Sequence, residues 1–289
     1  LRPHGLTGKS YAPSPGVYVP PAYGQTKQLT SLDTSGPASA AQKNDIQQTV
    51  GSLLFYARAL DGSFLQAVGL LSGNQANPTL NDVAANERLL RYANAHPSHS
   101  VQIRASNMRL GATVDGSYLS RKNSGSVVGG TFHLGPIPSA DLTKPTTPPN
   151  GLLHKFSLRI PVVVASAAEA EYCGLFAGLQ VLCHLRKTLT NLGYPQPPIP
   201  VYCDNLCAIG LATSTVRPKH SKSIDMRLDW TRDRVRQGLF TIHHVPGTEN
   251  LADFFTKTLP AYRHQELLPL LLGRLPPTDT TASPFPDPA

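Results

Sequence analysis

Charged residues are scarce in this sequence. Only 15% of its 289 residues are Asp, Glu, Lys or Arg, and 18 acidic against 26 basic residues leave a formal net charge of +8. Because the positive balance comes from a shortage of acids, the position of each acid is informative. Apolar residues make up 40% of the chain, which is enough for a packed core and excludes disorder along the whole length.

Long apolar runs and paired cysteines are missing as well. No apolar stretch approaches the ~20 residues that span a bilayer, and the chain begins Leu1, Arg2, Pro3, without an initiator Met or a signal-peptide pattern. The four cysteines form no C-x-x-C pair, so we expect free thiols in a reducing compartment rather than a zinc site or a disulfide scaffold. These absences predict an intracellular piece of a longer protein, with no membrane partner.

Proline and glycine, by contrast, are abundant and divide the chain, at 27 and 23 residues. Residues 1–38 are proline-rich and predict an extended arm. Residues 39–108 carry apolar side chains three and four positions apart, which predicts a small helical segment whose third helix begins at a Thr79 N-cap. Residues 109–262 mix strands and helices, and residues 263–289 predict a largely disordered tail.

The mixed part has the predicted order β-β-β-α-β-α-α-β-α. Strands are predicted at 110–119, 126–134, 156–165, 199–205 and 239–245. Helices are predicted to begin at Ser166 and to cover 206–213, 221–237 and 249–258. Pro161 favours a sheet edge for the third strand, and the proline-rich stretch 136–151 predicts a loop insertion. Three meandering strands followed by crossovers predict an α/β fold with a mixed five-stranded sheet and flanking helices, preceded by the helical segment.

Three aspartates stand where a carboxylate is out of place. Asp115 lies mid-strand among residues that favour burial, and Asp204 comes where an apolar strand ends. Asp253 lies on a helix beside Leu251 and Phe254. A buried carboxylate needs a partner, and strand ends in α/β sheets are where sites are built. The three aspartates are therefore candidates for one site.

The helix that begins at Ser166 offers a fourth acid, from two glutamates. Glu169 fits a capping box with Ser166, which gives it a structural role. Glu171 has no such role and begins a row with Leu175, next to a buried stripe. We therefore favour Glu171 as the functional glutamate.

These four acids have no Arg or Lys immediately beside them in sequence, which indicates ligands for a hard cation such as Mg²⁺ or Mn²⁺. Two such ions about 4 Å apart can hold a scissile phosphate, activate water and stabilise the leaving oxygen. The spacing alone also allows four unrelated acids, namely a turn residue, a cap and two surface helix positions.

Several stretches of the sequence resemble copia-type retrotransposon polyproteins. They are SAAEAEY (166–172), VYCDNLCAIGLA (201–212), SKSIDMRLDWTRDRVRQG (221–238), ENLADFFTK (249–257), VDGSYLSRKNSGSVVGGTFHLG (114–135) and VGSLLFYARAL (50–60). The resemblance covers about 39–260, and its motifs occur in the family's order. The acids resemble the D-E-D-D set of the ribonuclease H family in the same order.

The resemblance implies a ribonuclease H-like domain at 109–262, preceded at 39–108 by the tail of a reverse transcriptase. Its implied activity is hydrolysis of the RNA strand of RNA·DNA hybrids with two Mg²⁺ (or Mn²⁺) ions, in the cytoplasm or a retrotransposon particle. The implied catalytic metal ligands are Asp115, Glu171, Asp204 and Asp253. The implied protein partner is the polymerase domain of the same polyprotein. The sequence contains no paired aspartates of the polymerase type, so we do not expect this chain to copy nucleic acid.

Departures from the family leave two alternatives open. Gly116 follows the first aspartate where the family usually has Ala, and we expect it to loosen the backbone beside a ligand. The loop at 136–151 is long, and the family's K-H-I-D-I-R motif appears as residues 222–227 with a serine in place of the histidine. One alternative is a decayed relic that binds nucleic acid or a partner without turnover. The other is an integrase-like nuclease, whose essential glutamate comes last rather than second.

Basic residues gather between 217 and 236. Lys222, Arg232 and Arg236 are predicted to point outward and contact the phosphates of a hybrid duplex. The alternative interpretation is a solvated helix face with ion pairs between successive turns.

Two adjacent histidines, His243 and His244, lie on the last predicted strand and should face opposite sides of the sheet. One of them could move protons near Asp253, since the pKa range of histidine suits that work. The ordinary interpretation is one buried or edge histidine and one exposed histidine.

Overall fold

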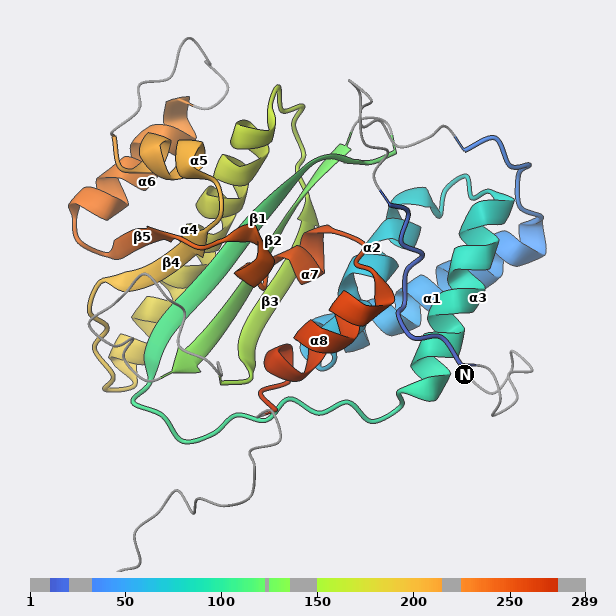
Figure 1. Ribbon diagram of the computed structural model, residues 1–289, viewed down its shortest axis with the longest axis horizontal. Helices are drawn as coiled ribbons and strands as arrows, with labels where there is room; N and C mark the ends of the chain where they lie inside the picture. Colours follow the sequence, from blue (N-terminus) through green and yellow to red (C-terminus); the bar gives the residue numbers. More distant parts are fainter. Residues whose placement is uncertain (1–10, 21–32, 123–124, 136–149, 215–224, 275–289) are drawn as a thin grey trace, which may run out of the picture.

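A mixed five-stranded sheet forms the centre of the computed structural model (Figure 1). Residues 11–20, 33–122, 125–135, 150–214 and 225–274 are described. The strands are β1 (Arg109–Arg121), β2 (Gly125–Gly135), β3 (Leu152–Arg159), β4 (Ile199–Cys203) and β5 (Phe240–His244). Their order across the sheet is β3-β2-β1-β4-β5, with β1 to β3 antiparallel and β4 and β5 parallel to β1. The predicted α/β fold with a mixed sheet is confirmed.

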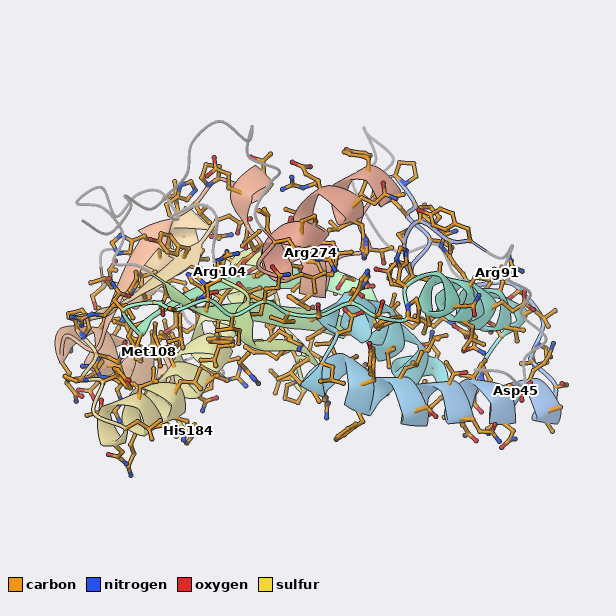
Figure 2. The ribbon with its side chains drawn as sticks, turned by 90° about the horizontal axis from the view of Figure 1, so that it is seen from below. Asp45, Arg91, Arg104, Met108, His184 and Arg274 are labelled. Carbon is orange, nitrogen blue, oxygen red and sulfur yellow. The ribbon has the colours of Figure 1, made fainter. Side chains whose placement is uncertain are left out.

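Helices α4 (Ala167–Asn191), α5 (Leu206–Ala212) and α6 (Asp225–Arg236) cover one face of this sheet. Ser166 caps α4 as predicted, because its side chain accepts a hydrogen bond from Glu169 N. The first apolar core fills the space between these helices and the strands, and Tyr172, Leu179 and Phe132 are fully buried in it. Figure 2 shows the layering, with His184 of α4 on one side and Arg274, just beyond the last helix, on the other.

The helical segment contains α1 (Ala40–Ala59), α2 (Leu65–Asn74) and α3 (Leu80–Ala95), with a 3₁₀ turn before α2. Capping boxes start two of these helices, Ser39 with Gln42 at α1 and Thr79 with Asp82 at α3. The second apolar core joins these helices to the C-terminal helices α7 (Asp253–Thr256) and α8 (Ala261–Leu271). The helical segment is thus packed against the carboxyl end of the chain.

Helix α8 corrects the prediction of a largely disordered tail at 263–289. His264, Leu267 and Leu271 lie on one face of α8 and are buried in the second core. Burying a leucine side chain contributes about 1.5–3 kcal/mol to stability. Because α8 is stabilised by this tertiary contact, the local sequence, which contains Pro269, did not predict the helix. Only the last part of the predicted tail, 275–289, lies outside the described residues.

Two further boundaries differ from the predictions. β3 covers Leu152–Arg159 instead of 156–165, because its partner β2 begins at Gly125 and offers no backbone partners beyond Ile160. The predicted helix at 249–258 is a 3₁₀ turn followed by the single turn of α7, so Asp253 is the first residue of a short helix. The predicted loop insertion falls mostly on 136–149, outside the described residues.

The described part of the predicted arm, 11–20, has no regular secondary structure but is packed at its start. Ala12 and Ser14 are buried, and Arg88 of α3 donates hydrogen bonds to the carbonyl oxygens of Ser14 and Gly16. Within the described residues, no helix is long and apolar enough to cross a bilayer. The four cysteines are free thiols, as predicted.

His264 gives the second core a dependence on pH. Its ring packs against Phe254 and Tyr92, and burial together with the neighbouring His96 lowers the pKa of His264 to about 4. His99 also lowers this pKa, and Asp61 raises it. Between pH 6.5 and 4, this histidine is protonated in the unfolded chain but neutral in the folded chain. The stability that it contributes is therefore fully present above pH 6.5 and is lost as the pH falls toward 4.

We therefore expect the His264→Phe variant, which keeps an aromatic ring in the core, to resist acid better than the wild type. The loss in free energy of unfolding between pH 7 and pH 4.5 should be smaller by about 2–3 kcal/mol, measured by urea denaturation at each pH. The exposed His184 on α4 provides the control variant His184→Gln, which should behave like the wild type. Equal acid sensitivity of His264→Phe and the wild type would contradict this role.

Candidate functional site

The structure brings the four predicted acids together at one end of the sheet. Asp115 lies in the middle of β1, and Asp204 directly follows the parallel neighbour β4. Because Thr113 pairs with Tyr202, the positions two residues further along each strand place Asp115 beside Asp204. One carboxylate oxygen each of Asp115, Asp204 and Asp253 lie within 4.8 Å of one another.

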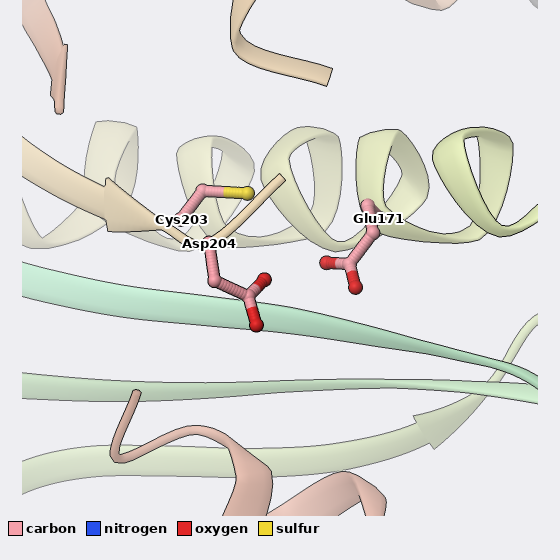
Figure 3. A group of neighbouring side chains, drawn as sticks. All are labelled: Glu171, Cys203 and Asp204. Atoms are coloured by element: carbon pink, nitrogen blue, oxygen red, sulfur yellow. The ribbon is translucent and has the colours of Figure 1, made fainter. Parts of the chain in front are cut away.

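Glu171 reaches the cluster from the first turns of α4. Its Oε2 accepts a hydrogen bond of 2.9 Å from Gly116 N, and one of its carboxylate oxygens lies within 4.8 Å of Asp204. Figure 3 shows the carboxylates of Glu171 and Asp204 turned toward one another across β1. Glu169 instead accepts a bond of 2.7 Å from Ala165 N and secures the start of the helix. Glu169 thus has a structural contact at the start of the helix, with Ala165 N rather than the predicted N-cap nitrogen of Ser166, and the functional role of Glu171 stays a prediction.

Three glycines allow α4 to approach β1 so closely. A Cβ atom on Gly116 would lie 2.2 Å from the carbonyl oxygen of Ala170, and one on Gly174 would lie 2.7 Å from the carbonyl oxygen of Asp115. Gly178 similarly faces the side chain of Val114. Gly116 makes room for the backbone that carries Glu171, a role that the prediction of a loosened backbone did not include.

The carboxylates of the cluster repel one another more than nearby positive charge can offset. Burial, reinforced by the charges of Asp115 and Asp204, raises the pKa of Glu171 to about 9. Burial and the charge of Asp115 also raise the pKa of Asp253 to about 7 and that of Asp204 above its ordinary value. Oδ1 of Asp204 is buried without a hydrogen-bond partner among the described residues. Each raised pKa reflects a negative charge held unfavourably.

Lys257 and Thr256, which the sequence did not single out, also contact the cluster. Lys257 Nζ lies 2.6 Å from Asp253 Oδ1 and 3.4 Å from Asp115 Oδ1, and Thr256 Oγ1 donates a hydrogen bond to Asp115 Oδ2. Although burial acts to lower it, the carboxylates of Asp115 and Asp253 raise the pKa of Lys257. The spacing of four between Asp253 and Lys257 is the helical ion-pair spacing that could have revealed this contact.

Cys203 also lies beside Glu171 and Asp204 but is a poor ligand (Figure 3). Its side chain is fully buried in the first apolar core, and burial together with the charge of Glu171 raises the pKa of its thiol. A neutral thiol binds hard cations weakly, since metal binding requires the thiolate and Mg²⁺ prefers oxygen. The donor set of the cluster is therefore composed of oxygen atoms.

The two histidines of β5 differ as the ordinary interpretation expects. His243 is partly buried, with its ring packed against Tyr202 at 5.7 Å between ring centroids, and burial lowers its pKa. His244 is exposed. Within the described part of the chain, no hydrogen bond joins either histidine to the four carboxylates, so proton transfer by His243 or His244 stays a prediction.

The basic stretch is described from Asp225 onward, so Lys222 lies outside the described residues. Arg232 is only partly exposed, and its Nε donates a bond of 2.8 Å to the carbonyl oxygen of Leu211 at the end of α5. Its predicted outward position is corrected, because this guanidinium tethers α6 to α5. Arg236 is exposed as predicted, and Leu228 and Thr231 form the buried side of α6.

Comparison with known proteins points to one group of relatives. The chain is 27% identical over 282 residues to the retrovirus-related Pol polyprotein from transposon RE1 of Arabidopsis thaliana, covering 90% of this chain and 18% of the relative. It is 32% identical over 111 residues to that of transposon TNT 1-94 of Nicotiana tabacum, covering 38% of this chain and 8% of the relative. The chain is a relative of retrotransposon Pol polyproteins. It spans less than a fifth of the length of these relatives.

Solved structures give low-scoring superpositions on this chain. Superposition on LC11-RNase H1, isolated from compost, gives a TM-score of 0.38 at 16% identity, covering 52% of this chain and 93% of that one. The foamy viral protease-reverse transcriptase in complex with RNA/DNA hybrid gives 0.38 at 14% identity, covering 86% and 30%. None of the established protein-family profiles matches the chain.

Proposed function

We propose that this chain hydrolyses the RNA strand of RNA·DNA hybrids in a metal-dependent reaction, as the ribonuclease H part of a retrotransposon polyprotein. The observation that carries the proposal is the convergence of Asp115, Glu171, Asp204 and Asp253 from four separate parts of the fold onto one partly buried cluster. A chain with few acids gains nothing for stability by gathering four of them, since each raised pKa marks an unfavourable charge. Its similarity to Pol polyproteins supports the same activity.

The cluster fits divalent cations such as Mg²⁺ or Mn²⁺. Its donors are carboxylate oxygens, and the unpartnered Oδ1 of Asp204 leaves a free coordination position. Asp115 and Asp204 would anchor both ions, Glu171 would complete the shell of one ion, and Asp253 that of the other. When bound, the two ions supply an activated water and stabilise the departing 3′ oxygen.

Hydrogen bonds from neighbouring groups orient the carboxylates that would bind the metal ions. The Gly116 N–H holds Oε2 of Glu171 in place, and Thr256 does the same for Oδ2 of Asp115. Such contacts reduce the freedom of the carboxylates before substrate arrives, which is how a preorganised site lowers the barrier. Arg236 and Lys222 are proposed to contact phosphates of the hybrid, and contacts with 2′-hydroxyls to select RNA. The polymerase domain of the same polyprotein is the proposed protein partner.

An assay of the purified chain on a labelled hybrid tests this proposal. We expect cleavage in Mg²⁺ or Mn²⁺ and none in excess EDTA. Binding of the hybrid without cleavage at any concentration of either ion would instead identify a decayed relic that only binds nucleic acid. Cleavage that continues at full rate in EDTA would exclude the metal-dependent mechanism.

Lys257 should compete with metal for the carboxylates of Asp115 and Asp253. Its ammonium already neutralises both, so a cation that binds there has to displace it. We expect Lys257→Met to lower the apparent Kd for Mn²⁺ at least about tenfold by calorimetric titration, since a charge pair at about 4 Å is worth several kcal/mol at intermediate dielectric constant. The same variant should melt at a lower temperature in EDTA.

The exposed Lys187 on α4 provides the control variant Lys187→Met, which should leave both quantities unchanged. An unchanged or weaker affinity of Lys257→Met for Mn²⁺ would show that Lys257 does not occupy the metal position.

A further inference from the structure

A second polar pocket lies away from the carboxylate cluster. It encloses about 790 Å³ between α2, the end of α1, the turn of the β1–β2 hairpin and the edge strand β3, which meet at one end of the sheet (Figure 1). Four cationic side chains line it: Arg58, Arg121, Lys122 and Arg159. Among the described residues that line it, no side chain is acidic.

Arg121 is the innermost of these cations. Its Nη1 is buried and has no hydrogen-bond partner among the described residues, and its Nη2 lies near Gly69 of α2. Burial and the charge of Arg159 lower the pKa of Arg121 to about 10, which still leaves it protonated at neutral pH. A buried guanidinium beside a like charge is costly unless an anion pairs with it.

Lys122 is the one cation of the pocket that has a described ion pair with acids. Lys122 Nζ contacts Asp33 and Asp82 at 3.2 and 3.1 Å, and Asn74 donates a hydrogen bond of 2.8 Å to Asp82. The positive charge of Lys122 is thereby balanced, whereas Arg58, Arg121 and Arg159 take part in no described ion pair with an acid. Three guanidinium groups therefore surround a cavity with no opposite charge.

We propose that this arginine pocket binds phosphate groups of a nucleic-acid backbone. Guanidinium groups match the geometry of phosphate oxygens with two parallel hydrogen bonds, and the pocket is far larger than one phosphate ion. Gly69 and Gly73 add no side chains to the wall that α2 forms, which leaves room there for a sugar-phosphate chain.

The pocket lies on the face of the sheet that carries α7. Ser157, which lines the pocket, donates a hydrogen bond of 2.6 Å to the carbonyl oxygen of Phe255 in α7. Arg121 is six residues beyond Asp115 along β1, or at most about 20 Å at roughly 3.3 Å per residue. Since a duplex rises about 3.4 Å per base pair, a hybrid held at the carboxylates could reach the pocket about six base pairs away. In this respect the inference rests on the proposed function.

The salt dependence of hybrid binding tests the proposal without requiring cleavage. Fluorescence anisotropy in EDTA with an 18-base-pair RNA·DNA hybrid gives the slope of log Kobs against log salt, whose magnitude falls by about 0.9 for each phosphate that the protein no longer neutralises. We expect Arg58→Gln and Arg159→Gln each to reduce the slope by about that amount and, at 0.1 M salt, to weaken binding roughly eightfold. Both residues are exposed, so their variants should fold.

The matched control is Arg91→Gln, since Arg91 is exposed on α3, pairs with Glu87 and does not line the pocket. It should leave the slope unchanged. Slopes of Arg58→Gln and Arg159→Gln equal to that of Arg91→Gln would overturn the proposal. A second result would also overturn it. If inorganic pyrophosphate stabilises the wild type but not Arg159→Gln, and the salt slope for the hybrid is the same in both proteins, the pocket is a site for small anions only. If the arginine variants change the salt slope as expected but the wild type cleaves no hybrid, the result contradicts the proposed function and leaves the phosphate-binding pocket supported.

Discussion

Asp204→Asn should reduce cleavage of an RNA·DNA hybrid in Mg²⁺ by at least about 10³-fold, since removing a ligand that serves both ions abolishes the charge stabilisation they supply. Affinity for the hybrid, measured by anisotropy in EDTA, should change less than threefold, because most of the binding energy comes from contacts with phosphates elsewhere. Single-turnover kinetics with saturating enzyme separate the two quantities.

The variant should also melt at an equal or higher temperature than the wild type in EDTA. Burial and the charge of Asp115 raise the pKa of Asp204, so its ionised form opposes folding above the pKa of the unfolded chain, and the neutral amide removes that cost. Loss of cleavage therefore cannot be attributed to unfolding. The exposed Glu87 on α3 provides the control variant Glu87→Gln, which should cleave normally. Wild-type cleavage by Asp204→Asn would show that the site is assigned to the wrong residues.

Gly116→Ala should have the second largest effect, on both stability and activity. The added methyl group would lie 2.2 Å from the carbonyl oxygen of Ala170 and 2.5 Å from the backbone nitrogen of Glu171. Because both atoms belong to the backbone of α4, the start of that helix has to move away from β1, taking Glu171 with it. We expect a loss of about 3 kcal/mol or more in the free energy of unfolding by urea denaturation, and cleavage reduced at least about 100-fold in the fraction that stays folded.

Gly51→Ala is the matched control for this substitution. Gly51 lies within α1, and no atom within 4 Å opposes an added Cβ. Alanine there should raise the stability by up to about 1 kcal/mol, as it does in helix interiors. A Gly116→Ala protein with the stability and activity of the wild type would mean that α4 and β1 are not in close contact at this point.

Features determined by local chemistry could be predicted from the sequence. Helices begin at the predicted caps Thr79 and Ser166, because a capping side chain and the first turn of its helix are neighbours along the chain. The strands of the β1–β2 hairpin were predicted from local sequence, as were three aspartates from their unfavourable positions, and Glu171 was selected because Glu169 fits a capping box.

Features determined by distant contacts could not be predicted in this way. The end of β3 depends on where β2 begins, which the apolar run through Val162 and Val163 does not reveal, and the structure leaves Val163 86% exposed. α8 depends on the second core, and Lys257 acquires its role only when α7 lies against β1. Gly116 was identified, but its function depends on the approach of a helix that begins 51 positions later.

The central claim is that the four carboxylates serve hydrolysis of RNA in a hybrid duplex. The most direct measurement uses one RNA·DNA hybrid labelled separately on each strand, with DNA·DNA and RNA·RNA duplexes of the same sequence, incubated with the purified chain in Mg²⁺. We predict cuts only in the RNA strand of the hybrid, with products that carry a 3′ hydroxyl and a 5′ phosphate. Cuts in the DNA strand, equal cutting of all three duplexes, or no cutting in any of them would contradict that claim.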